Sequence, residues 1–174
     1  MTATQAEQIA YHESAHAVVH HCFGHPIASI EIGDNTGRCV LLPEYEEHFN
    51  TSGVVEVARR ESLCRYIMAC CAGKCAMDRW HGYKADSDHN WKQSDDYKQA
   101  LSYALEINQG DSVGAELLVK WLARRAELLV ERYWSRIDAL AFALLDKEKL
   151  SGAEISEILK NHRDRWVRNT ARSN

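Results

Sequence analysis

The residues best suited to chemistry lie near the N-terminus and read His12-Glu13-Ser14-Ala15-His16. Residues four apart lie on one face of an α-helix, so the imidazoles of His12 and His16 can bind one metal ion. Neutral imidazole suits zinc, and a catalytic zinc site has three protein ligands and one open position. Glu13 lies about 100° around the helix from His12 and can take a proton from a water molecule at that position. The pattern predicts zinc-dependent hydrolysis of an amide bond, with Glu13 as general base.

The helix that must present these residues is predicted from about Thr4 to Cys22, and it ends near Gly24 and Pro26. Its apolar residues share one stripe with the two histidines, so the imidazoles point into the protein. This stripe comprises Ile9, His12, His16, Val19 and Phe23. The alternative is a pair of core histidines, but two buried imidazoles beside a glutamate are hard to satisfy without a cation.

Two histidines leave a zinc site incomplete, so the sequence must supply a third ligand elsewhere. A third histidine six residues after the second is absent, because Cys22 stands there. Asp96 falls in the first turn of a helix capped by Ser94, although a carboxylate there also stabilises the helix without binding metal. The residues alone leave the choice open among Asp86, Asp88, His89, Asp95 and Asp96.

The other elements follow from changes in hydrophobic period. Alternation over 27–32 and 38–42, around a turn-rich segment at 33–37, predicts a β-hairpin that ends at Pro43. Helices are predicted from Val54 to about Met77 with Ser52 as cap, from Asp95 to about Asn108, from Asp111 or Ser112 to about Leu145, and after the capping box 151–154. The third would be about 50 Å long, which suggests an internal break. We expect one mainly α domain over residues 1–174 with a small β-hairpin.

Composition excludes several classes of function. A net charge of −4 over 174 residues gives no sign of a nucleic-acid partner or an anionic membrane. The longest apolar run, 66–77, is too short to form a transmembrane segment, and the polar N-terminus is unlike a signal peptide. Of the six cysteines, four fall in one predicted helix, which favours a reducing, cytoplasmic location over a disulfide framework. We interpret Cys64, Cys71 and Cys75 as packing residues rather than metal ligands.

Taken in order, several motifs resemble the peptidase domain of the FtsH-type, ATP-dependent zinc proteases. Residues 11–19 resemble that family's metal-binding helix, and 25–32 with 42–44 resemble its hairpin. Residues 72–76 with Gly82 are similar to its glycine-arginine-alanine-alanine helix, 94–97 to the segment that carries its zinc-binding aspartate, and 150–155 to its closing helix. The resemblance implies a helical zinc-peptidase fold in which His12, His16 and Asp96 bind zinc and Glu13 is the general base.

The same resemblance implies that a strand edge near the zinc holds an extended polypeptide substrate by its backbone. In this chain that strand carries Arg38, Cys39, Val40 and Leu41. Asp88 is the runner-up zinc ligand, because residues 85–88 fit the same motif but lack the alanines that should follow. The chain also departs from the family at Ala15, where a glycine is usual, and at Met77, where a glutamate is usual.

The resemblance does not include the family's ATPase. Gly73-Lys74 is followed by Cys75 and lacks the upstream glycine of a phosphate-binding loop. We expect a stand-alone peptidase domain, or a piece of a longer chain, that cleaves unfolded or flexible polypeptides alone or with a separate ATPase. Because family members form rings, a homo-oligomer is also compatible with the resemblance. The alternative function is a catalytically inactive binding or regulatory module with the same fold.

Overall fold

The fold is mainly helical, as predicted, in a computed structural model that describes residues 4–42, 57–82 and 90–171, with side chains through His162. In chain order the elements are α1 (Gln5–Cys22), β1 (Ile27–Gly33), β2 (Thr36–Leu41), α3 (Val57–His81), α5 (Asp95–Ile107), α6 (Ser112–Arg132), α7 (Trp134–Lys147), β3 (Lys149–Ser151) and α8 (Gly152–Ala171). The expected cap Ser52 and the segment 43–56 lie outside the described residues.

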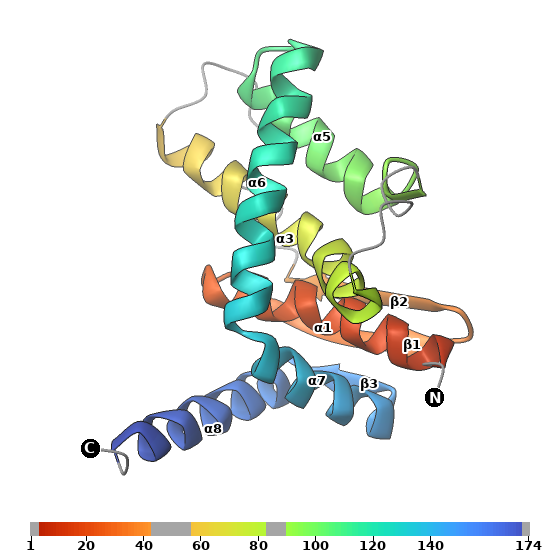
Figure 1. Cartoon of the computed structure of the whole chain (residues 1–174), viewed down its shortest axis with the longest axis vertical. Helices are drawn as coiled ribbons and strands as arrows, with labels where there is room; N and C mark the ends of the chain where they lie inside the picture. The colour runs from red at the N-terminus through yellow and green to blue at the C-terminus, as the bar shows by residue number, and fades with distance from the viewer. Residues whose placement is uncertain (1–3, 43–56, 83–89, 172–174) are drawn as a thin grey trace.

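Helix α1 is the central element of the core. It begins with a capping box, in which Thr4 Oγ1 accepts from the Glu7 N–H at 3.3 Å and the Glu7 carboxylate accepts from the Thr4 N–H at 2.6 Å. Helix α1 carries three fully buried alanines, Ala10, Ala15 and Ala17. Their small side chains let α3, α7 and the sheet pack closely around α1. Figure 1 shows α1 crossing the molecule between α3 and α7. The predicted end at Cys22 is confirmed, and Gly24 takes a positive φ of 75° just beyond it.

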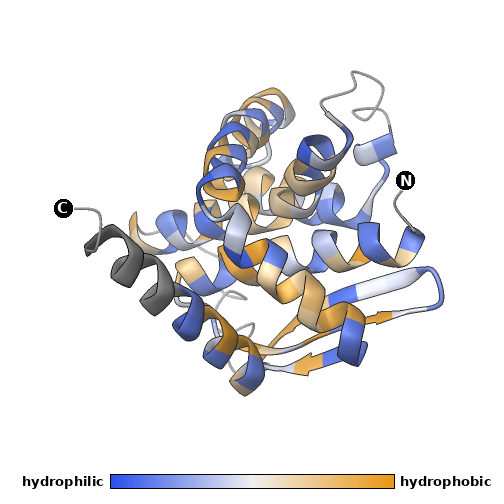
Figure 2. Ribbon diagram, turned by 60° about the horizontal axis from the view of Figure 1, so that its bottom comes forward, coloured by the Kyte–Doolittle hydropathy of each residue, from blue (hydrophilic) through white to orange (hydrophobic). Residues whose placement is uncertain are grey.

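The predicted hairpin is confirmed, and a third strand that was not predicted joins it. The antiparallel order is β2-β1-β3, with Ile30 opposite Cys39 on one side and opposite Leu150 on the other. Asn35 supplies the positive φ of 68° in the turn, which Figure 2 shows as hydrophilic. Strand β2 therefore lies at an edge of the sheet.

The long apolar-periodic segment breaks at Tyr133 into α6 and α7, as its length suggested. The N-cap of α6 is Asp111, whose carboxylate accepts from the N–H groups of Val113 and Gly114 at 3.1 Å. The capping box of α8 is also confirmed, because the Ser151 N–H donates to Glu154 at 2.9 Å. None of the helices within the described residues has the length and apolar character needed to cross a membrane.

Helices α3, α5 and α6 pack against one another, and α3 joins this group to α1. The middle of α3 is buried and rich in small side chains, including Cys71 and Cys75. Cys75 Sγ lies 3.6 Å from the Ala123 carbonyl of α6, so it serves helix packing, as expected. All six cysteines are free thiols, and Cys64 is partly exposed.

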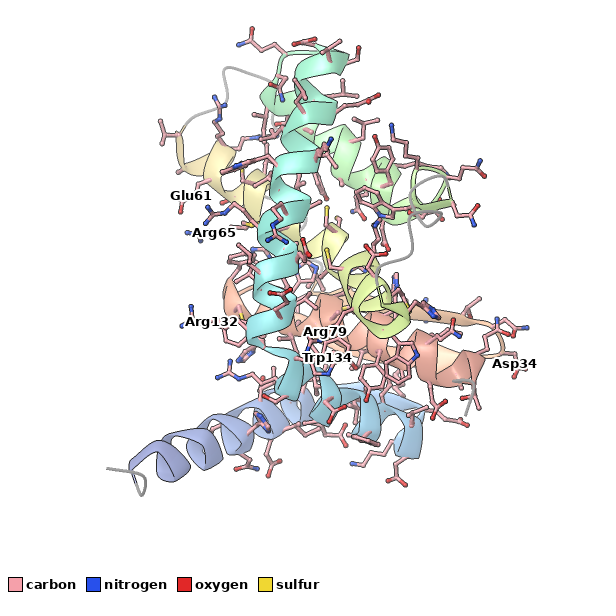
Figure 3. All side chains as sticks on the ribbon, viewed as in Figure 1. Asp34, Glu61, Arg65, Arg79, Arg132 and Trp134 are labelled. Carbon is pink, nitrogen blue, oxygen red and sulfur yellow. The ribbon has the colours of Figure 1, made fainter. Side chains whose placement is uncertain are left out.

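An aromatic cluster fixes the N-terminal half of α1. Tyr11 stacks on Trp134 of α7 with ring centroids 5.5 Å apart, and it contacts Trp80 of α3 at 4.2 Å. The Tyr11 hydroxyl donates to Asp138, and Arg79 covers the other ring of the stack at 4.7 Å, as Figure 3 shows beside Trp134. These contacts hold the helix that carries the histidine pair against two neighbours.

Candidate metal centre

Three side chains from α1 and α5 converge on one point. His12 Nε2 lies 3.0 Å from His16 Nε2 and 3.1 Å from Asp96 Oδ2, and His16 Nε2 lies 3.3 Å from the same oxygen. Such a group can hold a metal ion. Neighbouring ligand atoms around a tetrahedral zinc ion are roughly 3.3 Å apart, so the spacing of these donors fits zinc.

The surroundings of His16 select the tautomer that can bind metal. Its Nδ1 lies 2.8 Å from the carbonyl oxygen of Ala69 in α3, so Nδ1 must carry the proton and donate it. Nε2 is then the nitrogen that faces His12 and Asp96 and that can bind a metal ion. A backbone carbonyl behind a histidine ligand is the arrangement typical of metal sites, because it fixes the ring and raises its basicity.

Asp96 reaches the two histidines because of how α5 begins. Ser94 is the N-cap, and its hydroxyl accepts from the Tyr97 N–H at 3.2 Å, which fixes the first turn. In that turn Asp96 faces α1, while the Asp95 side chain is 98% exposed and pairs with Lys98 at 2.8 Å. The structure therefore brings Asp96 into the site and leaves Asp95 out of it.

The three ligands differ in exposure. The His16 side chain is 8% exposed, whereas those of His12 and Asp96 are 29% and 31% exposed. The site therefore has a buried floor formed by His16 and an accessible side. An ion held there would keep a route for water and substrate, as a catalytic site requires.

Charge complementarity also favours a cation between these groups. Burial acts to lower the pKa of His16, but hydrogen bonding and charge attraction from Asp96 outweigh it and raise the pKa to about 9. Burial acts to raise the pKa of Asp96, but the hydrogen bonds from His12 and His16 bring it below its usual range. The carboxylate is thus ionised and demands positive charge from its neighbours, which a bound dication supplies.

Glu13 lies beside this group and is buried. Burial raises the pKa of its carboxyl group, while the charges of the neighbouring histidines oppose that shift. A raised pKa makes a carboxylate a better proton acceptor near neutral pH. Its neighbour on the β2 side is Gly37, where a Cβ atom would lie 2.9 Å from Glu13 Oε1.

A cavity of about 430 Å³ lies beside the edge strand, and residues one helical turn or less from His16 and Asp96 line it, although the three metal-binding residues themselves do not. His20 lies one helical turn beyond His16, and Gln99 lies almost one turn beyond Asp96, and both line it. The four residues predicted to bind substrate line the same cavity, namely Arg38, Cys39, Val40 and Leu41. Tyr66, Cys70 and Tyr103 complete the lining.

Three of the remaining candidates, Asp86, Asp88 and His89, lie outside the described residues, and two residues near the end of α3 lie within them. Met77 packs against the core, and Asp78 forms an ion pair with Lys74. Neither of these two residues is among the three that can hold the ion.

Sequence reasoning missed a second histidine pair next to the site. His20 Nδ1 and His25 Nδ1 lie 2.8 Å apart, and the His25 ring stacks on Tyr66 at 4.4 Å. Burial lowers the pKa of His20 to about 3 and that of His25 to about 4. Both rings therefore serve packing at the end of α1. Their spacing in the sequence, five residues across a helix end, gave no signal that they pair.

Comparison with protein-family models and with curated proteins finds no match for this chain. The function of the protein must therefore be inferred from the geometry of the site and from the residues that form it.

Proposed function

We propose that this protein is a zinc-dependent metalloendopeptidase of the FtsH peptidase class that hydrolyses peptide bonds of unfolded or flexible polypeptides. The observation that carries the proposal is the convergence of His12, His16 and Asp96 within 3.3 Å, with the buried Glu13 beside them. Three protein ligands with an accessible side are the ligand number of a catalytic rather than a structural zinc site.

Each residue then has a distinct task. When bound, zinc supplies Lewis-acid polarisation of a water molecule and of the substrate carbonyl. Glu13 accepts the proton of the attacking water and donates it to the leaving amine, which its raised pKa favours. His16 stays rigid through its bond to the Ala69 carbonyl, so the attack geometry is set before substrate binds.

The edge of β2 is the proposed substrate-binding element. An extended peptide can add to this edge as a further strand, with its backbone paired to residues 38–41. The adjoining cavity then receives a substrate side chain. Backbone pairing requires an extended and therefore unfolded segment, so folded proteins are substrates only after another protein, such as an ATPase, unfolds them.

The test separates metal binding from hydrolysis. Glu13→Gln is isosteric and leaves the three ligands in place, so we expect unchanged zinc content and a loss of casein cleavage of at least about 1000-fold. Metal analysis by mass spectrometry and a fluorescent casein assay measure the two quantities. Cleavage by Glu13→Gln at the wild-type rate would remove Glu13 from the mechanism.

Two further outcomes decide against the proposal. A wild-type protein that binds zinc but cleaves no member of a broad peptide library would be the inactive binding module instead. A wild-type protein that binds no zinc would leave the convergence of His12, His16 and Asp96 without a metal-binding role.

A further inference from the structure

Two glycines from different elements touch the functional residues of α1 more closely than any side chain would allow. Gly73 lies in the middle of α3, opposite the histidine pair, and Gly37 lies in β2, opposite Glu13. Neither has a positive φ, so the backbone conformation does not demand glycine at either position. The reason for glycine must be the close approach.

At Gly73 the missing side chain leaves space at the metal-binding atoms themselves. A Cβ atom there would lie 2.5 Å from His16 Nε2 and closer still to His12 Nε2 and Cε1. These two nitrogens are the atoms that would bind the ion. His16 cannot move aside, because Ala69 holds its other nitrogen, whereas the partly exposed His12 can rotate toward solvent.

At Gly37 the missing side chain lets the edge strand lie directly on the general base. A Cβ atom there would lie 2.6 Å from Glu13 Cγ and 2.9 Å from Glu13 Oε1. On its other side it would meet Ile9 Cγ2 at 2.5 Å, so Glu13 could not be relieved by a shift of the strand along α1. The close approach of β2 at Gly37 thus limits the positions that the Glu13 carboxylate can take against the strand.

We propose that Gly73 and Gly37 are separate positioning residues of the centre: Gly73 keeps the coordination space between the two imidazoles open, and Gly37 sets the position of Glu13. This inference rests on the proposed function. According to this inference, α3 supplies the glycine that affects metal binding, and β2 supplies the glycine that affects proton transfer by Glu13.

The first test is the Gly73→Ala variant. Alanine favours a helix interior over glycine, but its methyl group meets both imidazoles, so the apoprotein should keep its fold with a thermal midpoint below that of wild type. Its zinc affinity, measured by competition with a chelator, should fall about 100-fold or more, and the cobalt form should lose its tetrahedral absorption. A folded Gly73→Ala variant with wild-type zinc affinity would overturn this half of the inference.

If Gly73→Ala is strongly destabilised, a mutant cycle that includes both histidines decides. Truncation of His12 and His16 removes the two rings that the new methyl group meets, so adding Gly73→Ala to a His12→Ala/His16→Ala background should cause a much smaller loss of apoprotein stability. An equal loss in both backgrounds would show that the glycine serves α3 itself and would overturn the inference.

The second test is Gly37→Ala, with Gly33→Ala as its matched control. A Cβ atom at Gly33, in the other strand of the hairpin, meets only Thr36 Oγ1 at 3.7 Å, an ordinary contact. Gly37→Ala should bind zinc as wild type does and lower kcat for a fluorogenic peptide about 10- to 100-fold with KM little changed, while Gly33→Ala keeps wild-type kcat. Loss of zinc in Gly37→Ala, or an equal loss of kcat in both variants, would overturn the division of roles.

Failure of the proposed function is distinguishable from failure of this inference. A wild-type protein without zinc affinity rejects the former before any glycine variant is made. A wild-type protein that binds zinc and cleaves peptides, together with glycine variants that do the same, rejects only the latter.

Discussion

The three candidate ligands are held with unequal firmness, and this inequality has chemical consequences. His16 is buried and bonded through Nδ1 to a backbone carbonyl, and Asp96 stands in a capped helical turn. His12 is more exposed, and its ring contacts are with the other two members of the site. We infer that His16 and Asp96 form the rigid part of the centre, and that His12 completes it when an ion binds.

Asp96 and Asp95 form a natural pair of variants for testing the third ligand. Asp96→Ala removes a ligand oxygen 3.1 Å from His12 Nε2, so zinc affinity should fall by about 100-fold or more. Asp95→Ala removes an exposed carboxylate that pairs only with Lys98 among the contacts described, and zinc affinity should not change. Chelator competition measures both. Equal affinity in the two variants would mean that Asp96 is not a ligand and that a residue such as Asp88 must be examined.

At the residue scale, short-range patterns were predictable and long-range contacts were not. His12, Glu13 and His16 follow from helical spacing, and Ser94 places Asp96 in a first turn. Nothing in the spacing shows that Asp96 returns to α1 from 80 residues further along the chain, because that depends on how α3 and α5 pack. The roles proposed for Gly73 and Gly37 were not predictable for the same reason, since each depends on a neighbour from another element.

At the scale of elements, the site is a meeting of helix α1, helix α5 and the edge strand β2. The cavity between α5 and β2 is the only one of the described cavities that all four predicted substrate residues line. Gln99 and Tyr103 form its α5 wall, with the Gln99 amide donating to the Tyr103 hydroxyl at 3.1 Å. This wall is therefore the place to alter substrate binding without touching the metal.

Filling the cavity should weaken peptide binding. Gln99→Trp places a large ring against β2, so KM for an unstructured peptide should rise about tenfold, with zinc content unchanged. Lys98→Trp adds the same bulk to an exposed neighbouring position and should leave KM unaltered. Steady-state kinetics with a fluorogenic peptide measure both. A similar KM for the two variants would argue that the substrate lies elsewhere.

The helices and the hairpin were predictable because caps, glycines and periodicity act locally. The capping box at Ser151 and the cap Ser94 appear where the sequence indicated, and Asp111 is the cap of the two residues, Asp111 and Ser112, that the sequence left open. Strand β3 was missed because its three residues are too few for alternation to show, and it forms only by pairing with β1.

At the scale of the whole molecule, buried histidines link stability to pH. His20 and His25 pair through their Nδ1 atoms at 2.8 Å, and the backbone N–H of His25 also donates to the His20 carbonyl at 3.0 Å. Together these two hydrogen bonds hold the short loop between α1 and β1 in place. Burial lowers both pKa values, and for His25 the charge of Arg65, labelled in Figure 3, adds to the effect.

The sign of the pH dependence follows directly. The unfolded chain protonates histidine near pH 6.5, whereas the folded protein keeps His20 neutral down to about pH 3 and His25 down to about pH 4. Between these limits the unfolded state binds more protons, so the free energy of unfolding falls as the pH is lowered. His16, whose pKa is raised to about 9, acts in the opposite direction but gains less below pH 7 because it is already protonated in the folded apoprotein.

We therefore expect the apoprotein to lose on the order of 2 kcal/mol of unfolding free energy between pH 7 and pH 5, as measured by urea denaturation in the presence of a chelator. His20→Asn should reduce this loss substantially, because an amide can bond to His25 Nδ1 without titrating. His162→Gln is the control, since this partly exposed ring bonds to Ser135 on the surface and should leave the pH dependence as it is in wild type. If the unfolding free energy of His20→Asn falls as much between pH 7 and pH 5 as that of the wild type, the buried histidine pair does not cause the loss. The carboxylates would then be the groups to test.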